Sequence, residues 1–441
     1  MPSHVEAAVI GKLPEGFLSR SSILDFSHGY QPPREVLLPA SGDRLFVFPE
    51  VNEDIYNQVY KKLLVEGESL PNGFDFSLFF TLREWVKAKH PEDFEKIVTK
   101  VSELPNREYQ VLGDPGVHVI LPHQSRSDKD MLMKIGLRAF EDDFGFRSRG
   151  LWPPETAVSR ETLDVAADNG YEFAVLRADQ LKSADTNPVW VDLGNGKGIF
   201  VVTFDPGLNQ SVSFEKGISD NADQFLDRFS NSGPKPLAIA SDMERWGHHV
   251  PLTDQFITYL FKPTTLEKHG FAPFNIKSSL DKSKVQATEV RDNTSWSCAH
   301  NLGRWTGECD DDINSDLPQE AKERIKRDKA NLYSTLTEYG TEINIRLDVK
   351  DANWREKFVD FFISNRSLMF DSGVDATGVE INDGNRLFWA KYCELVGKTS
   401  CGWFFGAEDR PERAYPRSMI GEIEKLVPDI NEHTVFEDQA A

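Results

Sequence analysis

Four short apolar runs in this chain each end on a polar residue that can act on a substrate. They cover residues 23–28, 150–155, 200–205 and 237–242, and they end on His28, Glu155, Asp205 and Asp242. Helical patterns lie between most of these runs, which predicts parallel strands that share one sheet or barrel. Because the carboxyl ends of parallel strands meet at one rim, we expect Glu155, Asp242 and His28 to face one cleft.

A pair of carboxyl groups across a cleft is suited to breaking a glycosidic bond. This reaction needs one acid to protonate the leaving oxygen and one carboxylate to attack or to activate water. Glu155 and Asp242 can divide these tasks if their surroundings push their pKa values apart. Pro153 and Pro154 fix two φ angles just before Glu155 and stiffen its approach. Carboxylates at strand ends also serve as structural caps, so the spacing alone leaves both roles open.

Tryptophans beside polar groups add to the case for a carbohydrate site. Sugars stack their C–H faces on such rings, whereas a buried tryptophan with a satisfied N–H is the structural alternative for each one. The run 242–249 places several polar and aromatic residues directly after one apolar strand, so we interpret it as part of the site. The tryptophans in question are Trp152, Trp246, Trp296, Trp305 and Trp403.

The segment 295–309 is also rich in reactive side chains. A zinc site built from Cys298, His300 and Cys309 is one interpretation. The spacing of eleven positions between the two cysteines is not that of a standard zinc finger, which favours buried structural thiols. We therefore expect no metal and no cofactor in the active site.

The amino-acid composition excludes several classes of protein. The chain has 441 residues, 39% of them hydrophobic, and a formal charge of −21, which argues against binding to nucleic acid or to an anionic membrane. The first twenty residues lack the pattern of a secretory signal, and no apolar run reaches the roughly 18 residues of a membrane span. Four cysteines are few for a disulfide scaffold, so we expect a cytoplasmic protein. Self-association into a homo-oligomer stays open.

The hydrophobic pattern suggests two parts. We expect an α/β domain over 20–310, with a helical insertion at about 52–103, and a helical domain over 311–441 packed on it. Within the first part, we expect a buried strand at 118–121 and a helix at 128–143. A further helix should begin at the N-cap Ser159, and a tight turn is expected at Asn195-Gly196. In the second part we expect helices at 319–338, 354–363, 386–396 and 418–426.

The motifs resemble those of the family-57 glycoside hydrolases, in family order and over most of residues 23–405. The resemblance implies an incomplete (β/α)7 TIM-like barrel followed by a helical region, and retaining cleavage or transfer of α-glucosidic bonds without an obligatory metal. The matching stretches are His-Gly-Tyr-Gln-Pro-Pro-Arg-Glu at 28–35, Gly-Leu-Trp-Pro-Pro-Glu-Thr-Ala at 150–157, Ser-Asp-Met-Glu-Arg-Trp-Gly-His-His at 241–249, 295–300 with Arg304-Trp305, and Thr-Ser-Cys-Gly-Trp-Phe-Phe at 399–405.

By position, the resemblance makes Glu155 the nucleophile and Asp242 the general acid/base. For such an enzyme we expect the two carboxyls to lie about 5–6 Å apart. The predicted substrate-binding residues are His28, Gln31, Trp152, Glu244, Trp246, His248 and His249, with Trp296, His300 and Trp403 at the rim.

The favoured hypothesis is an α-amylase-like hydrolase whose partner is an oligo- or polysaccharide. A 4-α-glucanotransferase or branching enzyme on the same scaffold is the first alternative. A carbohydrate-binding protein without catalysis is the second, because Phe26 stands where the family's first motif usually carries a histidine. A metal-dependent polysaccharide deacetylase is the third, with ligands from His28, Asp205 and His248 or His249.

Overall fold

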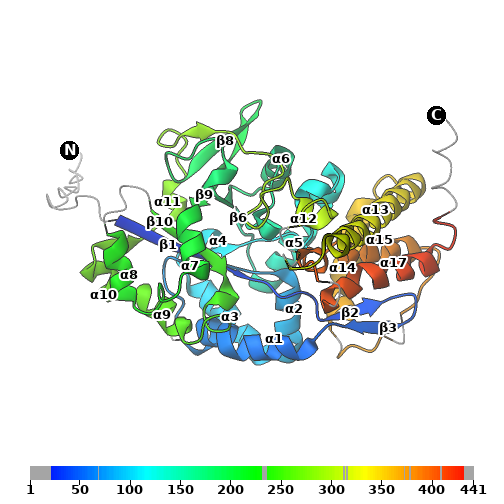
Figure 1. Ribbon diagram of the computed structural model, residues 1–441, viewed down its shortest axis with the longest axis horizontal. Helices are drawn as coiled ribbons and strands as arrows, with labels where there is room; N and C mark the ends of the chain where they lie inside the picture. Colours follow the sequence, from blue (N-terminus) through cyan, green and yellow to red (C-terminus); the bar gives the residue numbers. More distant parts are fainter. Residues whose placement is uncertain are drawn as a thin grey trace, which may run out of the picture.

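The computed structural model describes residues 21–67, 69–230, 236–310, 313, 316–371, 373–376, 379–407 and 410–431. A curled parallel sheet with its covering helices forms one side of the molecule, and a group of long helices forms the other (Figure 1). Strand β1 runs toward these long helices, so the carboxyl ends of the strands face the junction of the two parts.

Seven strands follow one another in parallel around the curled sheet. In spatial order they are β10 (Leu237–Asp242), β1 (Ser21–Gly29), β4 (Phe74–Leu78), β5 (Val111–Leu112), β6 (Gly150–Leu151), β7 (Phe173–Arg177) and β9 (Lys197–Phe204). A single parallel bridge between Gly113 and Leu151 carries the pairing from β5 to β6. No ladder joins β9 to β10 in the part of the chain that the structure describes, so the barrel is incomplete there. This architecture confirms the predicted fold class.

The remaining strands extend the edges. Strand β8 (Val189–Gly194) pairs antiparallel with β9 through the predicted turn, in which Asn195 and Gly196 both have positive φ. Strands β11 (Phe271–Pro273) and β12 (Ala287–Thr288) pair with β1 and β8. Strands β2 (Glu35–Leu38) and β3 (Asp43–Phe46) form a separate hairpin beneath the long helices (Figure 1).

Alternate side chains of β1 point into the barrel and fill its interior. Leu24 and Phe26 are fully buried in an interior cluster that also contains Trp152, and His28 stands one layer above Phe26 on the same face of the strand. Phe26 therefore belongs to the hydrophobic interior of the barrel and does not line the cavity at the carboxyl ends of the strands. The register sets His28 beside Asp242 of β10 on one side and Ser77 of β4 on the other.

Helices cover the outside of the sheet. They are α1 (Pro49–Ile55), the π-helix η1 (Tyr56–Glu66), α2 (Phe80–Lys89), α3 (Pro91–Glu103), α4 (Arg107–Gln110), α5 (Arg126–Phe144), α6 (Arg160–Asp168), α7 (Pro206–Phe214), α8 (Ala222–Phe229), α9 (Thr253–Leu260), α10 (Pro263–Lys268) and α11 (Ile276–Ser279). Helix α5 matches the helix predicted at 128–143. The Ser159 side chain caps α6 as predicted, accepting the Thr162 N–H.

Two predictions in this part of the chain were wrong. Residues 118–121 form no strand; they make one bridge, from Val119 to Thr399, and then a short turn. The segment predicted as a helical insertion at 52–103 contains β4, a core strand. Leu78, the last residue of β4, stands at helical spacing from Leu82 of α2, so the end of the strand was interpreted as the start of the helix.

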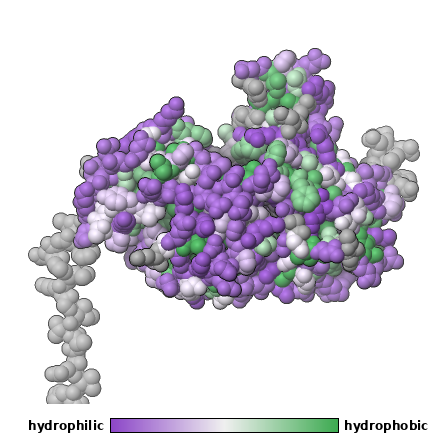
Figure 2. Space-filling view, turned by 90° about the horizontal axis from the view of Figure 1, so that it is seen from below, coloured by the Kyte–Doolittle hydropathy of each residue, from purple (hydrophilic) through white to green (hydrophobic). Residues whose placement is uncertain are grey.

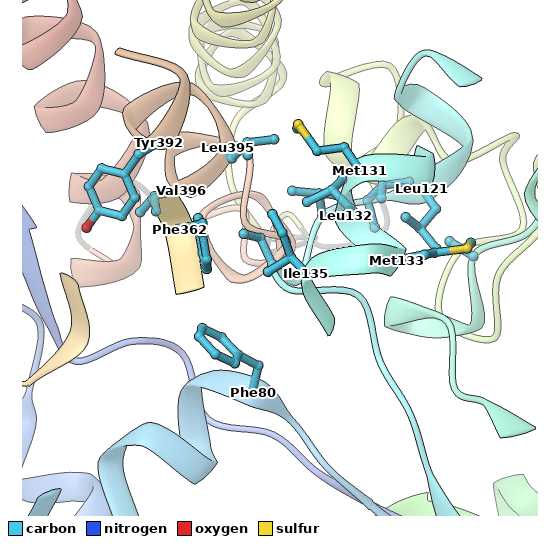
Figure 3. Packing of buried hydrophobic residues seen from close by; sticks show 14 of the residues in the cluster. Phe80, Leu121, Met131, Leu132, Met133, Ile135, Phe362, Tyr392, Leu395 and Val396 are labelled. Atoms are coloured by element: carbon cyan, nitrogen blue, oxygen red, sulfur yellow. The ribbon is translucent and has the colours of Figure 1, made fainter. Parts of the chain in front are cut away.

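The second part contains α12 (Gly303–Thr306), α13 (Gln319–Lys350), α14 (Trp354–Phe370), α15 (Arg386–Gly397), α16 (Cys401–Phe404) and α17 (Ala414–Leu426). The four predicted helices correspond to α13, α14, α15 and α17, and both α13 and α14 extend further than predicted. One hydrophobic cluster joins both parts: Phe80 of α2 lies 5.8 Å from the ring of Phe362 of α14 and faces it in Figure 3. A domain division at 310/311 therefore stays a prediction.

The surface agrees with the acidic composition. The face in Figure 2 is mostly hydrophilic, with small and scattered hydrophobic areas. None of the helices in the described residues combines the length and the apolar character that crossing a bilayer requires.

Candidate active site

A cavity of about 640 Å³ opens at the carboxyl ends of the strands. Its walls come from the ends of β1 and β10, the turn at 154–156, the segment 296–304 and the region around α16. The structure thus brings together residues that are far apart in sequence, from His28 to Glu412. The predicted residues that line this cavity are His28, Gln31, Glu155, Asp242, Glu244, His248, His249 and Trp296.

Glu155 is held by three hydrogen-bond donors. Ser297 Oγ donates to Glu155 Oε2 at 2.8 Å and Trp296 Nε1 donates to the same oxygen at 3.3 Å. Ser400 Oγ donates to Oε1 at 3.4 Å. The backbone of Glu155 is left-handed, with φ +57°, a costly conformation for a non-glycine residue that persists only where surrounding contacts impose it. Burial raises the pKa of Glu155, and the hydrogen bonds act against that rise.

Asp242 ends strand β10, and its side chain is exposed to the cavity. Enclosure by the cavity walls raises the pKa of Asp242 well above its ordinary value, and the nearby carboxyls of Glu244 and Glu155 raise it further. Asp242 and Glu155 thus line the same cavity.

Glu244 lies two residues further and is buried. Its carboxylate accepts hydrogen bonds from the Tyr60 hydroxyl and from Gln31 Nε2, the latter at 2.9 Å. Arg34 in turn donates to Gln31 Oε1 at 3.0 Å. Burial raises the pKa of Glu244, while the donors Tyr60 and Gln31 oppose the rise. A fixed acidic group thus lies next to Asp242.

A chain of hydrogen bonds runs from β4 to Glu155. Ser77 Oγ lies 2.6 Å from His28 Nδ1, His28 Nε2 lies 3.2 Å from His118 Nε2, and His118 Nδ1 lies 2.7 Å from Ser400 Oγ, the donor to Glu155. Burial lowers the pKa of His28 to about 3 and that of His118 well below its ordinary value, so both rings are neutral. If Nε2 of His28 and Nδ1 of His118 carry the protons, each group in this series donates its hydrogen bond to the next group toward Glu155.

Three of the predicted sugar contacts are wrong in this structure, because the side chains are buried and do not line the cavity. Trp152 stacks on His28 from below, with ring centroids 5.0 Å apart. Trp246 donates to Ser27 Oγ at 2.9 Å, and Ser27 donates to the buried Asp25. Trp403 donates to the Gly397 carbonyl at 3.1 Å. Trp246 and Trp403, with satisfied N–H groups in hydrocarbon, stabilise the wall rather than contact substrate, whereas Nε1 of the buried Trp152 has no hydrogen-bond partner.

Comparison with known proteins agrees with this geometry. The profile described as "Glycosyl hydrolase family 57" matches residues 44–290, which is more than half of the chain. The chain belongs to glycosyl hydrolase family 57. Membership indicates a glycoside hydrolase or transglycosylase. No curated protein matches the sequence.

Solved structures share the family-57 fold at low sequence identity. An exo-type maltose-forming amylase from Pyrococcus sp. ST04 has 15% identity and a TM-score of 0.64, covering 95% of this chain and 81% of that one. A GH57-type branching enzyme from Pyrococcus horikoshii has 13% identity and a TM-score of 0.60, covering 94% and 91%. An α-amylase from Thermotoga maritima has 13% identity and a TM-score of 0.59, covering 95% of each chain.

Some residues of this family-57 cavity were not predicted from sequence. The residues in question are Tyr30, His118, Ser297, Arg304, Cys401, Phe404, Phe405, Arg410 and Glu412. Three exposed phenylalanines stand on its walls: Phe48, Phe214 and Phe405, which are 49%, 82% and 36% exposed. No sequence signal distinguishes such phenylalanines from core residues, because only their exposure reveals them.

Two predicted positions lie elsewhere. His300 does not line the cavity; it lies in a cluster with Cys298 and Cys309. Asp205, a ligand in the deacetylase hypothesis, caps α7 by accepting the Leu208 N–H at 2.8 Å. Both ring nitrogens of His28, another such ligand, are engaged by Ser77 and His118. This ligand set is not assembled in the described part of the chain.

Proposed function

We propose that this family-57 protein is a retaining glycoside hydrolase that cleaves α-glucosidic bonds of α-glucans and maltooligosaccharides. The observation that supports the proposal most strongly is the pair of carboxyl groups in one cavity, of which Asp242 has a pKa raised by burial and further by Glu244 and Glu155. A retaining mechanism requires one ionised and one protonated carboxyl group on opposite sides of the scissile bond.

Glu155 fits the nucleophile role. Donors from Ser297, Trp296 and Ser400 orient its carboxylate and favour the ionised form. Two neutral histidines stand behind Ser400 and keep it directed at Glu155. The carboxylate would attack the anomeric carbon and form a glycosyl-enzyme as the leaving oxygen departs.

Asp242 fits the acid/base role. Its raised pKa keeps the carboxyl protonated, so that it can donate the proton to the leaving oxygen. When Glu155 becomes an ester, its charge disappears and one cause of the raised pKa disappears with it. The pKa of Asp242 then falls, and the same group can remove a proton from the attacking water.

The cavity suits a carbohydrate chain. Carboxyl, imidazole and amide groups line it, and the exposed phenylalanines on its walls offer faces for sugar rings. The α-glucan assignment is supported by family membership and by the maltose-forming amylase that shares the fold. Transfer to a second glucan is the alternative, favoured by the similar fold of the branching enzyme.

The test is a product profile on maltoheptaose and glycogen, with the first-formed anomer followed by proton NMR. We expect shorter maltooligosaccharides released as α-anomers. Longer products or new branch points would instead support the transferase alternative. First-formed β-anomers would contradict retention, and an unchanged substrate would contradict the proposal.

Phe214 at the end of α7 is the most exposed aromatic side chain of the cavity wall. We expect Phe214→Ala to raise KM for maltoheptaose by roughly 3- to 10-fold and to leave kcat nearly unchanged, because one sugar stack of about 1 kcal/mol is lost. Val349→Ala is the matched control, since Val349 is 83% exposed and lies outside the cavity. Equal KM values in the two variants would remove Phe214 from substrate binding.

Glu244 should tune the pH dependence of activity. The protonated form of Asp242 is the active one, so activity is lost as pH rises through its raised pKa. Glu244→Gln removes a negative neighbour and lowers this pKa, so we expect the alkaline limb of kcat/KM to move down by about one pH unit. Glu172→Gln, before β7 at the opposite end of the barrel, should leave the limb in place. An unmoved limb in Glu244→Gln would contradict the coupling.

A further inference from the structure

A second cluster of reactive side chains lies behind the cavity wall. One ligand atom each from Cys298, His300 and Cys309 lies within 4.8 Å of the others, and no other such group occurs in the described residues. Cys309 Sγ is 3.5 Å from His300 Nδ1. Both cysteines are buried and neither is in a disulfide, whereas His300 is exposed. The side chains form a three-sided site with an opening to solvent.

The backbone between the two cysteines is tightly folded. Asn301 and Leu302 are both left-handed, with φ of +51° and +63°, and Leu302 is fully buried. The Gly303 carbonyl accepts the N–H of Cys309 at 3.2 Å, which closes the loop. Such a conformation costs of order 1–3 kcal/mol for each strained residue and persists only where surrounding contacts impose it.

Two thiolates and one imidazole are the donor set of a borderline-soft divalent cation. Zinc accepts this set in tetrahedral geometry, with a fourth position left for water. We propose that Cys298, His300 and Cys309 bind one Zn²⁺, with a solvent ligand completing the site. Binding would release one proton from each thiol as it becomes a thiolate, and no electron transfer is involved.

The position of the site indicates what the metal does. None of its three ligands lines the cavity, so the metal would not touch substrate. Ser297 and Trp296, which hydrogen-bond Glu155, directly precede Cys298. Arg304, whose charge lowers the pKa of Glu155, lies inside the loop between the cysteines. A metal here would fix the segment that holds Glu155, as a positioning site.

The first test measures metal binding and does not depend on the proposed glycosidase activity. The full chain, purified under reducing conditions, should carry about one zinc per molecule by mass spectrometry of metals. Replacement of zinc by Co²⁺ should give thiolate-to-cobalt charge-transfer absorption, which no surface site produces. The absorption should be lost in each ligand variant: Cys298→Ser, Cys309→Ser and His300→Ala, the last of which changes an exposed side chain. The control Cys393→Ala changes a buried thiol outside the site and should keep the absorption.

Two results would overturn the proposal. One is reduced wild-type protein that neither carries zinc nor develops the cobalt absorption. The other is a zinc-loaded protein in which chelation leaves hydrogen exchange of residues 296–309 unchanged, because a positioning metal must slow that exchange. Loss of glucan cleavage alone would bear on the proposed function and leave the zinc site standing.

Discussion

Glu155→Gln should lower the turnover of maltoheptaose by roughly 10⁴-fold or more, since the variant cannot form the glycosyl-enzyme. Gln keeps the size of the side chain and can still accept from Ser297, so the fold should persist. Initial rates of reducing-end release measure the loss. A circular dichroism spectrum and melting temperature close to those of wild type would show that the variant is folded.

Chemical rescue adds a second measure. In Glu155→Ala the space left by the carboxylate should admit azide, which can attack from the same face and give a β-glycosyl azide from a substrate with a good leaving group. Glu172→Gln, which removes the same charge at the amino end of the barrel, should retain wild-type rates. Near-wild-type turnover in Glu155→Gln would exclude the nucleophile role.

Asp242→Asn should lose about 10²- to 10⁴-fold in kcat on glucans, because the leaving sugar alcohol then departs without a proton. The loss should depend on the leaving group. With α-maltosyl fluoride, whose fluoride leaves without acid help, the first step stays fast while the second lacks its base. The variant should therefore accumulate a covalent adduct.

The adduct can be measured by intact-protein mass spectrometry and located on Glu155 by peptide mapping. The double variant Asp242→Asn with Glu155→Gln is the matched control and should show no adduct. Equal losses on glucan and on fluoride, with no adduct, would contradict the acid/base assignment for Asp242.

The strand ends that carry His28 and Asp242 could be predicted from the sequence, whereas Glu155 stands in a short turn four residues after β6 ends. Apolar runs that finish on His28 and Asp242 became the adjacent strands β1 and β10, and the Ser159 cap marked the start of α6. These features are local, because the spacing of apolar residues along a strand or a helix and the capping of a helix depend only on residues close together in the chain. Strand β4 was missed because its pattern continues into α2 without a clear change of period.

The sequence alone determined most of the elements, the family motifs and the residues that can do acid/base chemistry. Tertiary structure decided which aromatic residues reach the cavity: Trp246 and Trp403 are buried, and Phe214 is exposed. It also decided that His118 and Ser400 join His28 to Glu155, and that three ligand atoms meet at Cys298, His300 and Cys309. These relations depend on how segments hundreds of residues apart pack together, and packing is set by shape and burial summed over the whole core, which no local pattern encodes.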